Sequence, residues 1–297
     1  MSRLAWVDVF ASAPMTGNPL AVVLDAEGWP VNRMQAFAAE LGISETTFVL
    51  PAEADGDLRV RIFTPLRELP MAGHPIVGAA WVLHAADRIG ERAALETGAG
   101  TLAVRVHGSV ATMDQARPRG GQRVDTEEIA AALGCPVDAS PPAQVWSTGV
   151  PQLMVRARDI AALEAMRPDH DALRRLGERD GWIGVSAYVL PPEDDERLRL
   201  RVRHFAPLVG VPEDPATGSA AGALGACLAA AGMSGPGGDL EMVVSQGLEL
   251  GRPGEIAVRV VCVDGTPRRV QVGGQVVPLF EGRVLDDGGA ASHVGGG

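Results

Sequence analysis

The hydrophobic positions of the chain fall into two patterns, and each pattern predicts a different kind of element. Short apolar runs such as residues 21–24 and 58–63 are typical of strands, and residues 43–50 alternate as a strand does. After Asn32, which we expect to be the N-cap, apolar residues recur at helical spacing and stop at Gly42. The apolar face of this predicted helix holds Met34, Phe37, Ala38 and Leu41.

Two further stretches, residues 74–86 and 219–231, are rich in alanine and apolar on nearly every side. A helix with that pattern is buried in a core rather than laid on a surface. Each stretch follows a loop rich in proline and glycine, at residues 64–73 and 206–218. We therefore expect one buried helix, surrounded by strands, in each half of the chain.

The chain also repeats itself, which explains why the pattern occurs twice. Four segments of the first half resemble four segments of the second half in the same order. The matched pairs are 16–23 with 148–155, 42–50 with 184–190, 61–65 with 203–207 and 72–80 with 217–224. Each match is weak alone, but their common order indicates two homologous lobes.

The predicted fold is α+β, with two homologous lobes that are each a mixed or antiparallel β-barrel-like sheet around a central buried helix. The lobes are expected at residues 1–118 and 123–285, with the last strands free to return to the first lobe. Residues 117–122, rich in Arg, Pro and Gly, are the expected linker. The glycine-rich residues 286–297 predict a disordered tail.

Charge and cysteine content narrow the range of partners. Lys and Arg total 26 against 37 Asp and Glu, so the formal net charge is −11. Such a surface repels polyanions, and we expect neither a nucleic acid nor a membrane as partner. The three cysteines have no C-x-x-C spacing and fit neither a disulfide framework nor a zinc site. No signal peptide or bilayer-spanning stretch is found, so a cytoplasmic location is expected.

The two predicted buried helices both begin directly after a glycine, Gly73 or Gly218. The first turn of a helix leaves backbone N–H groups free, and these bind anions without Lys or Arg. If both helices point into the space between the lobes, they would hold a small carboxylate from two sides. The alternative is that the two glycines only permit tight turns.

Differences between the repeats point to the chemistry, because scaffold residues recur whereas catalytic groups need occur only once. The first half has Glu45 where the second has a gap or Ala187, and it has His74 where the second has Ser219. The strand pattern predicts that the Glu45 carboxyl faces inward, where burial raises its pKa and suits it to proton transfer. The alternatives are a solvated strand glutamate and a core or capping histidine.

The second half carries the acidic pair Glu213–Asp214 in the loop before its buried helix. Asp214 is either a helix cap or a carboxylate near His74 at the cleft. The histidines show no ligand spacing, so no metal site is expected. No glycine-rich nucleotide-binding motif is found, which leaves no expected cofactor.

Four motifs carry a resemblance to a known family. They are Ser44-Glu-Thr-Thr-Phe48, Glu68-Leu-Pro-Met-Ala-Gly-His-Pro75, Glu213-Asp-Pro-Ala-Thr-Gly-Ser219 and Gln246-Gly-Leu-Glu-Leu-Gly-Arg-Pro253. Together they make the chain resemble the phenazine-biosynthesis PhzF-like family, which is similar in fold to diaminopimelate epimerase. The likeness covers almost the whole chain and implies two lobes, no cofactor and a homodimer.

The resemblance also implies roles for individual residues. Glu45 would be the acid and base that moves the proton, and His74 and Asp214 would contact the substrate and set protonation states. The substrate-binding positions would be Ser44, Gly73, Gly218 and Ser219. The epimerase relatives carry a cysteine at each helix N-terminus, where this chain has glycine, so thiol-based epimerisation is disfavoured.

The expected function is that of a cofactor-independent isomerase of the trans-2,3-dihydro-3-hydroxyanthranilate isomerase type. It would move a proton within a small unsaturated or cyclic amino or hydroxy acid. Two alternatives stay open at this point. One is an amino-acid epimerase or racemase without the cysteine pair, and the other is a non-catalytic protein that binds small carboxylates.

Overall fold

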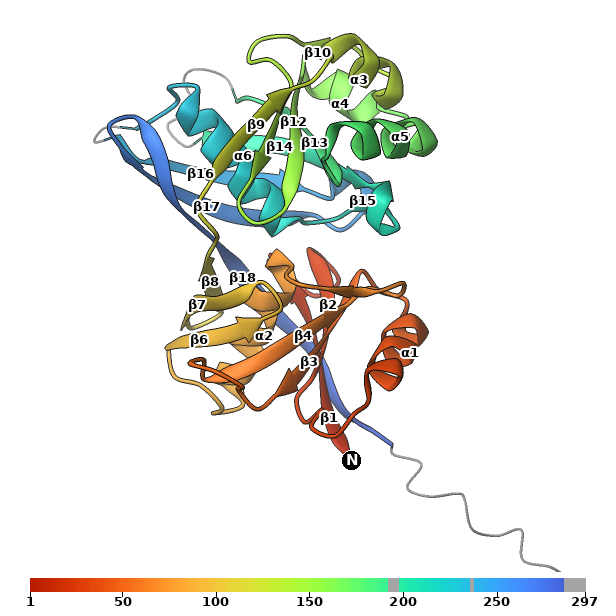
Figure 1. The fold of residues 1–297 in the computed structure, drawn as a ribbon, viewed down its shortest axis with the longest axis vertical. Helices are drawn as coiled ribbons and strands as arrows, with labels where there is room; N and C mark the ends of the chain where they lie inside the picture. Colours follow the sequence, from red (N-terminus) through yellow and green to blue (C-terminus); the bar gives the residue numbers. More distant parts are fainter. Residues whose placement is uncertain (192–197, 236–237, 286–297) are drawn as a thin grey trace, which may run out of the picture.

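The structure is a computed structural model that describes residues 1–191, 198–235 and 238–285. Its ribbon forms two bodies, one above the other in Figure 1, which the long strand β18 (Thr266–Val284) connects. The predicted tail at residues 286–297 lies outside the described residues. No helix in the described part of the chain is long and apolar enough to cross a membrane.

In the lower body the strands close into a ring. Each strand pairs with the next, in the order β1, β2, β3, β4, β6, β7, β8 and β18, and β18 pairs back with β1. The remaining bounds are β1 (Ser2–Val9), β2 (Asn18–Val23), β3 (Glu45–Leu50), β4 (Leu58–Phe63), β6 (Arg92–Thr97), β7 (Gly100–His107) and β8 (Val110–Asp114). Helix α2 (Gly73–Ala85) contacts every strand of this ring and fills the barrel.

In the upper body the strands follow the order β9, β11, β12, β13, β14, β16, β17 and β18 around helix α6 (Gly218–Ala230). Their bounds are β9 (Arg119–Arg123), β11 (Gln144–Ser147), β12 (Pro151–Ala157), β13 (Gly184–Val189), β14 (Leu198–Ala206), β16 (Leu240–Gln246) and β17 (Gly254–Val263). Within the described residues no pairing joins β9 to β18, so this sheet stays open.

Short elements complete the two sheets and cover their outer faces. The short strands are β5 (Glu68–Leu69), β10 (Val137–Asp138) and β15 (Val211–Asp214), and the outer helices are α1 (Val31–Leu41), α3 (Thr126–Leu133), α4 (Ile160–Ala165) and α5 (His170–Asp180). Single 3₁₀ turns follow β14 and β16, at Pro207–Val209 and Leu248–Leu250. The predicted α+β class is confirmed. The exact lobe boundaries stay a prediction, because β18 pairs in both bodies.

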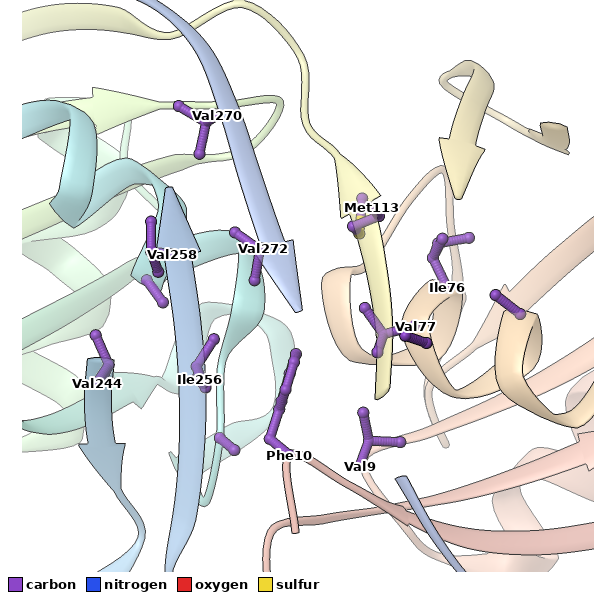
Figure 2. Packing of buried hydrophobic residues seen from close by; sticks show 14 of the residues in the cluster. Val9, Phe10, Ile76, Val77, Met113, Val244, Ile256, Val258, Val270 and Val272 are labelled. Carbon is purple, nitrogen blue, oxygen red and sulfur yellow. The ribbon is translucent and has the colours of Figure 1, made fainter. Parts of the chain in front are cut away.

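The two buried helices lie where the apolar pattern predicts them, each starting one residue earlier than expected. Their residues pack into one continuous core that spans both bodies. Figure 2 shows Phe10 between the two halves of this core, with Ile76, Val77 and Met113 on one side and valines of β16, β17 and β18 on the other. The two central helices therefore belong to one packed interior, which fixes their relative position.

Two local predictions need correction. Asn32 is not the N-cap of α1, because the helix begins one residue before it and Pro30 is the cap residue, whose carbonyl accepts the first N–H groups. Gly42 does end that helix, in the left-handed conformation at φ 64°. The expected linker at residues 117–122 is partly strand, since β9 pairs with β11. Its glycines are there for packing, because a Cβ at Gly120 would lie only 3.1 Å from the Trp146 ring.

Candidate active site

The N-termini of α2 and α6 meet at the centre of the molecule. A Cβ at Gly73 would lie 2.8 Å from the backbone nitrogen of Ser219, so only glycine permits this approach. Neither helix has a side-chain cap, because the cap residues Ala72 and Thr217 make no capping hydrogen bond to its first turn. Two sets of free N–H groups, with the positive ends of two helix dipoles, therefore lie side by side. This arrangement suits a bound carboxylate.

Glu45 and His74 face each other beside these helix ends. Glu45 is the first residue of β3, and His74 lies in the first turn of α2. Their atoms Oε2 and Nε2 are 3.5 Å apart, both are buried, and neither has a hydrogen-bond partner. Strand β3 contacts both α1 and α2, and the side chain of Glu45 is 14% exposed. Because of that burial and the nearby charge of Asp214, the pKa of Glu45 is raised to about 8.

Burial acts on His74 in the opposite direction and lowers its pKa to about 3, so the ring is neutral. Its second interaction is a hydrogen bond with the backbone of Pro19. Proline has no N–H, so its carbonyl must be the acceptor and the imidazole must donate. Since Nε2 is unpartnered, the proton is assigned to Nδ1, and Nε2 offers a lone pair toward Glu45.

Asp214 is held by a network that links the two bodies. Its Oδ1 accepts a hydrogen bond from Asn18 Nδ2 at 2.9 Å, and its Oδ2 accepts one from the Thr217 hydroxyl at 2.5 Å. Gln246 Nε2 donates to the Asp214 carbonyl at 2.7 Å. Burial raises the pKa of Asp214 to about 6, and the bonds from Thr217 and Asn18 act against that rise. Its acidic neighbour Glu213 is paired with Arg203.

These groups surround a cavity of about 340 Å³. Of the predicted site residues, Glu45, Asp214 and Ser219 line it. Ser44, Gly73, His74 and Gly218 adjoin these lining residues; Ser44 donates a hydrogen bond to Asn18, and Gly73 approaches Ser219 of α6. Larger hollows of about 590 and 620 Å³ contain none of the predicted residues. The cavity is large enough for one small ring carrying a carboxylate.

Several residues of the site are absent from the sequence prediction. Asn18, Thr217 and Gln246 hold Asp214, and each stands in a conspicuous motif without having been assigned a role. Gln152 and His204 line the cavity wall of the second half. No group of three His, Cys, Asp or Glu side chains within the described residues is arranged to hold a metal ion.

The strand register corrects the expected counterpart of Glu45. In the lower body β2 runs parallel to β3 and pairs Leu20 with Glu45, and in the upper body β12 runs parallel to β13 and pairs Gln152 with Gly184. Leu20 and Gln152 hold the same place in the repeated motif. The counterpart of Glu45 is therefore Gly184, and the expectation of a gap or Ala187 is wrong.

Comparisons with known proteins agree with the resemblance carried by the motifs. The model of the family described as "Phenazine biosynthesis-like protein" matches residues 7–282. The trans-2,3-dihydro-3-hydroxyanthranilate isomerase of Pseudomonas chlororaphis is 39% identical over 290 residues, which cover 96% of this chain and 100% of that protein. Both the family assignment and the prediction of an isomerase are confirmed.

Solved structures give the same result for the fold. A phenazine biosynthesis protein of the PhzF family from Bacillus anthracis superposes with a TM-score of 0.84 at 29% identity, covering 96% of this chain and 99% of that one. A hydroxyproline epimerase from Agrobacterium vitis superposes with a TM-score of 0.67 at 14% identity, covering 95% and 91%. The second likeness concerns the fold alone, and it confirms the epimerase-like architecture.

Proposed function

The chain belongs to the phenazine biosynthesis-like family, and we propose that it is a cofactor-independent isomerase that moves a proton within trans-2,3-dihydro-3-hydroxyanthranilate or a close relative of that acid. The observation that carries the proposal is the pair of Glu45 and His74, whose facing atoms are buried, unpartnered and 3.5 Å apart beside two uncapped helix ends. The relative from Pseudomonas chlororaphis, named for this activity, supports the choice of substrate.

In the proposed reaction the substrate carboxylate binds the free N–H groups at the start of α2 and α6. Glu45, as carboxylate, removes a proton from one carbon and returns it, as carboxylic acid, to another carbon of the same π-system. A pKa of about 8 keeps both forms accessible near neutral pH, which is what a residue that first accepts and then donates requires. The neutral His74 presents its Nε2 lone pair to a substrate N–H or O–H, or to the protonated Glu45.

Asp214 completes the proposed site as a positioning group. Its two oxygens are held by Asn18 and Thr217, so its place in the cavity wall is fixed. Its negative charge opposes ionisation of Glu45 and favours the protonated form that returns the proton. We include in the same proposal the small carboxylate as substrate, the homodimer and the cytoplasmic location, with sizing of the purified protein as the test of its assembly.

The experiment is turnover of trans-2,3-dihydro-3-hydroxyanthranilate in deuterated water, with wild type and Glu45→Gln compared. Wild type should yield an isomer whose mass differs from that of the substrate only by any deuterium taken up. The deuterium should appear at a second carbon, or be absent if the original proton is transferred internally to that carbon. Glu45→Gln should lose about 10²–10⁴-fold in kcat with little change in KM. Glu40→Gln, an exposed glutamate on α1, is the matched control and should behave as wild type.

Two results would contradict the proposal. A Glu45→Gln rate equal to wild type would remove the assigned acid and base. Exchange of label only at the original carbon, with inversion there and no double-bond movement, would make the protein an epimerase instead.

A further inference from the structure

At the position of the upper body that corresponds to Glu45 there is no acidic side chain, and two other polar side chains occupy the space. A Cβ at Gly184 would lie 2.7 Å from Gln152 Oε1 and 2.7 Å from His204 Nε2. Only a glycine allows both groups to occupy this position. Both Gln152 and His204 line the same cavity as Glu45 and Asp214.

The fold does not need polar residues at these two positions, because the lower body has apolar residues there. In the lower body the residues at the same places of β2 and β4 are Leu20 and Ile62, by the register that pairs each with β3. The equivalent pairs in the upper body involve Gln152 and His204. Two buried apolar positions have therefore become polar in only one half, where they face the cavity.

Gln152 is buried, with an exposed fraction of 2%, yet its Oε1 has no hydrogen-bond donor. A buried carbonyl oxygen without a donor costs free energy that a purely structural glutamine would avoid. Because Gln152 lines the cavity, a hydroxyl or amino group of a bound molecule can supply the missing donor.

His204 stands beside this oxygen as a neutral, oriented partner. Its Nδ1 is 2.8 Å from the hydroxyl of Ser186, which fixes the ring. Burial lowers its pKa to about 3, so it adds no charge to the wall. When Ser186 donates to Nδ1, Nε2 carries the proton, and the wall offers one donor and one acceptor next to each other. A hydroxyl or amino group can satisfy both at once.

We propose that Gln152 and His204 form a recognition site for a hydroxyl or amino substituent of the substrate, on the cavity wall that the upper body supplies. The carboxylate is held at the helix ends, and this second contact fixes how the ring lies over Glu45. The inference rests on the proposed function, because it takes the carboxylate to be bound there. It adds the substituent that distinguishes the substrate from a plain carboxylic acid.

The experiment measures binding rather than turnover, with three stable aromatic acids as probes. Benzoate, anthranilate and 3-hydroxyanthranilate share the carboxylate and differ stepwise in amino and hydroxyl groups. Calorimetric titration is carried out on wild type, Gln152→Met and Gln144→Met. Gln144 lies on the neighbouring strand β11, outside the cavity lining, so the same substitution there is the matched control. If Gln152→Met does not fold, Gln152→Leu, which introduces the lower-body residue, replaces it.

The expected result is that Gln152→Met weakens binding of the substituted acids about tenfold while benzoate changes less than about twofold. A loss with both substituted acids identifies the amino group, and a loss with 3-hydroxyanthranilate alone identifies the hydroxyl. An equal change for all three acids, no change at all, or no binding of any acid to wild type would overturn the inference. Substituent-dependent binding without turnover of the dihydro acid would instead reject the proposed function.

Discussion

The buried carboxyl of Glu45 should destabilise the folded protein at alkaline pH, and Glu45→Gln should relieve that cost. The folded protein holds this proton up to a pKa of about 8, whereas an unfolded chain releases it at about 4.5. Between these two values the folded state binds more protons than the unfolded state. The stability of wild type therefore falls as pH rises through this window.

The size of the effect follows from the width of the window. Each pH unit between 4.5 and about 8 removes about 1.4 kcal/mol from the free energy of unfolding, so the upper limit is about 5 kcal/mol. Part of the rise comes from the charge of Asp214, so the cost is shared with that group. We expect Glu45→Gln to be more stable than wild type by about 2–5 kcal/mol above pH 8 and equal to it below pH 4.5.

The assay is urea unfolding of both proteins between pH 4.5 and 9, with the difference in unfolding free energy plotted against pH. Glu96→Gln is a control of opposite sign, because Glu96 accepts hydrogen bonds from the N–H groups of Glu53, Gly56 and Ala54, which lower its pKa. That variant should be less stable than wild type at neutral pH, with a gap that closes in acid. Parallel curves for wild type and Glu45→Gln would refute the buried, protonated carboxyl.

Two further substitutions test other parts of the site. Asn18→Ala removes a donor to Asp214, so the pKa of that carboxyl should rise further in an NMR titration of its side-chain carboxyl carbon; an unmoved pKa would contradict the network. Gly73→Ala places a methyl group 2.8 Å from Ser219 N and should weaken carboxylate binding at least about tenfold in calorimetry. Gly90→Ala, whose nearest contact would be 3.9 Å, should bind as wild type.

Features that depend on neighbours along the chain were predictable from the sequence. The ends of the two buried helices and the stop at Gly42 follow from apolar spacing and glycine, and they lie within one residue of their expected places. The inward-facing Glu45 carboxyl was predicted from an alternating pattern that the structure does not show, because β3 begins at Glu45 and its next four residues are all buried. The Asn18–Asp214 hydrogen bond joins residues 196 positions apart, so no local pattern could have indicated it.

Matching residue types between the two halves did not give the correct alignment around Glu45. Matching glycine with glycine and serine with serine placed Gly42 opposite Gly184, whereas the strand register places Glu45 there. Register is set by backbone pairing and by which side chains face the core. The loops before the paired strands can differ in length by a few residues, and the motif letters alone do not show this shift. The replacement of Leu20 by Gln152 and of Ile62 by His204 stands in the matched segments themselves, but only the strand register brings both side chains to Gly184, the place opposite Glu45.

The strand pairing around Glu45 and Gly184 decides which basic groups the two halves bring to the cavity. Proton transfer that inverts one carbon needs an acid and a base on opposite faces, and a two-lobed site would offer them from equivalent places of its halves. Here one such place holds Glu45 and the other holds Gly184, whose missing side chain is replaced by a neutral amide and a neutral imidazole. Thiols cannot take that role, because none of the three cysteines lines the cavity. The carboxylate that the upper body does supply, Asp214, is held through both oxygens by Asn18 and Thr217. With no base at the place of Gly184, removal and return of the proton by Glu45 on one face is favoured, which suits a shift between two carbons of one ring.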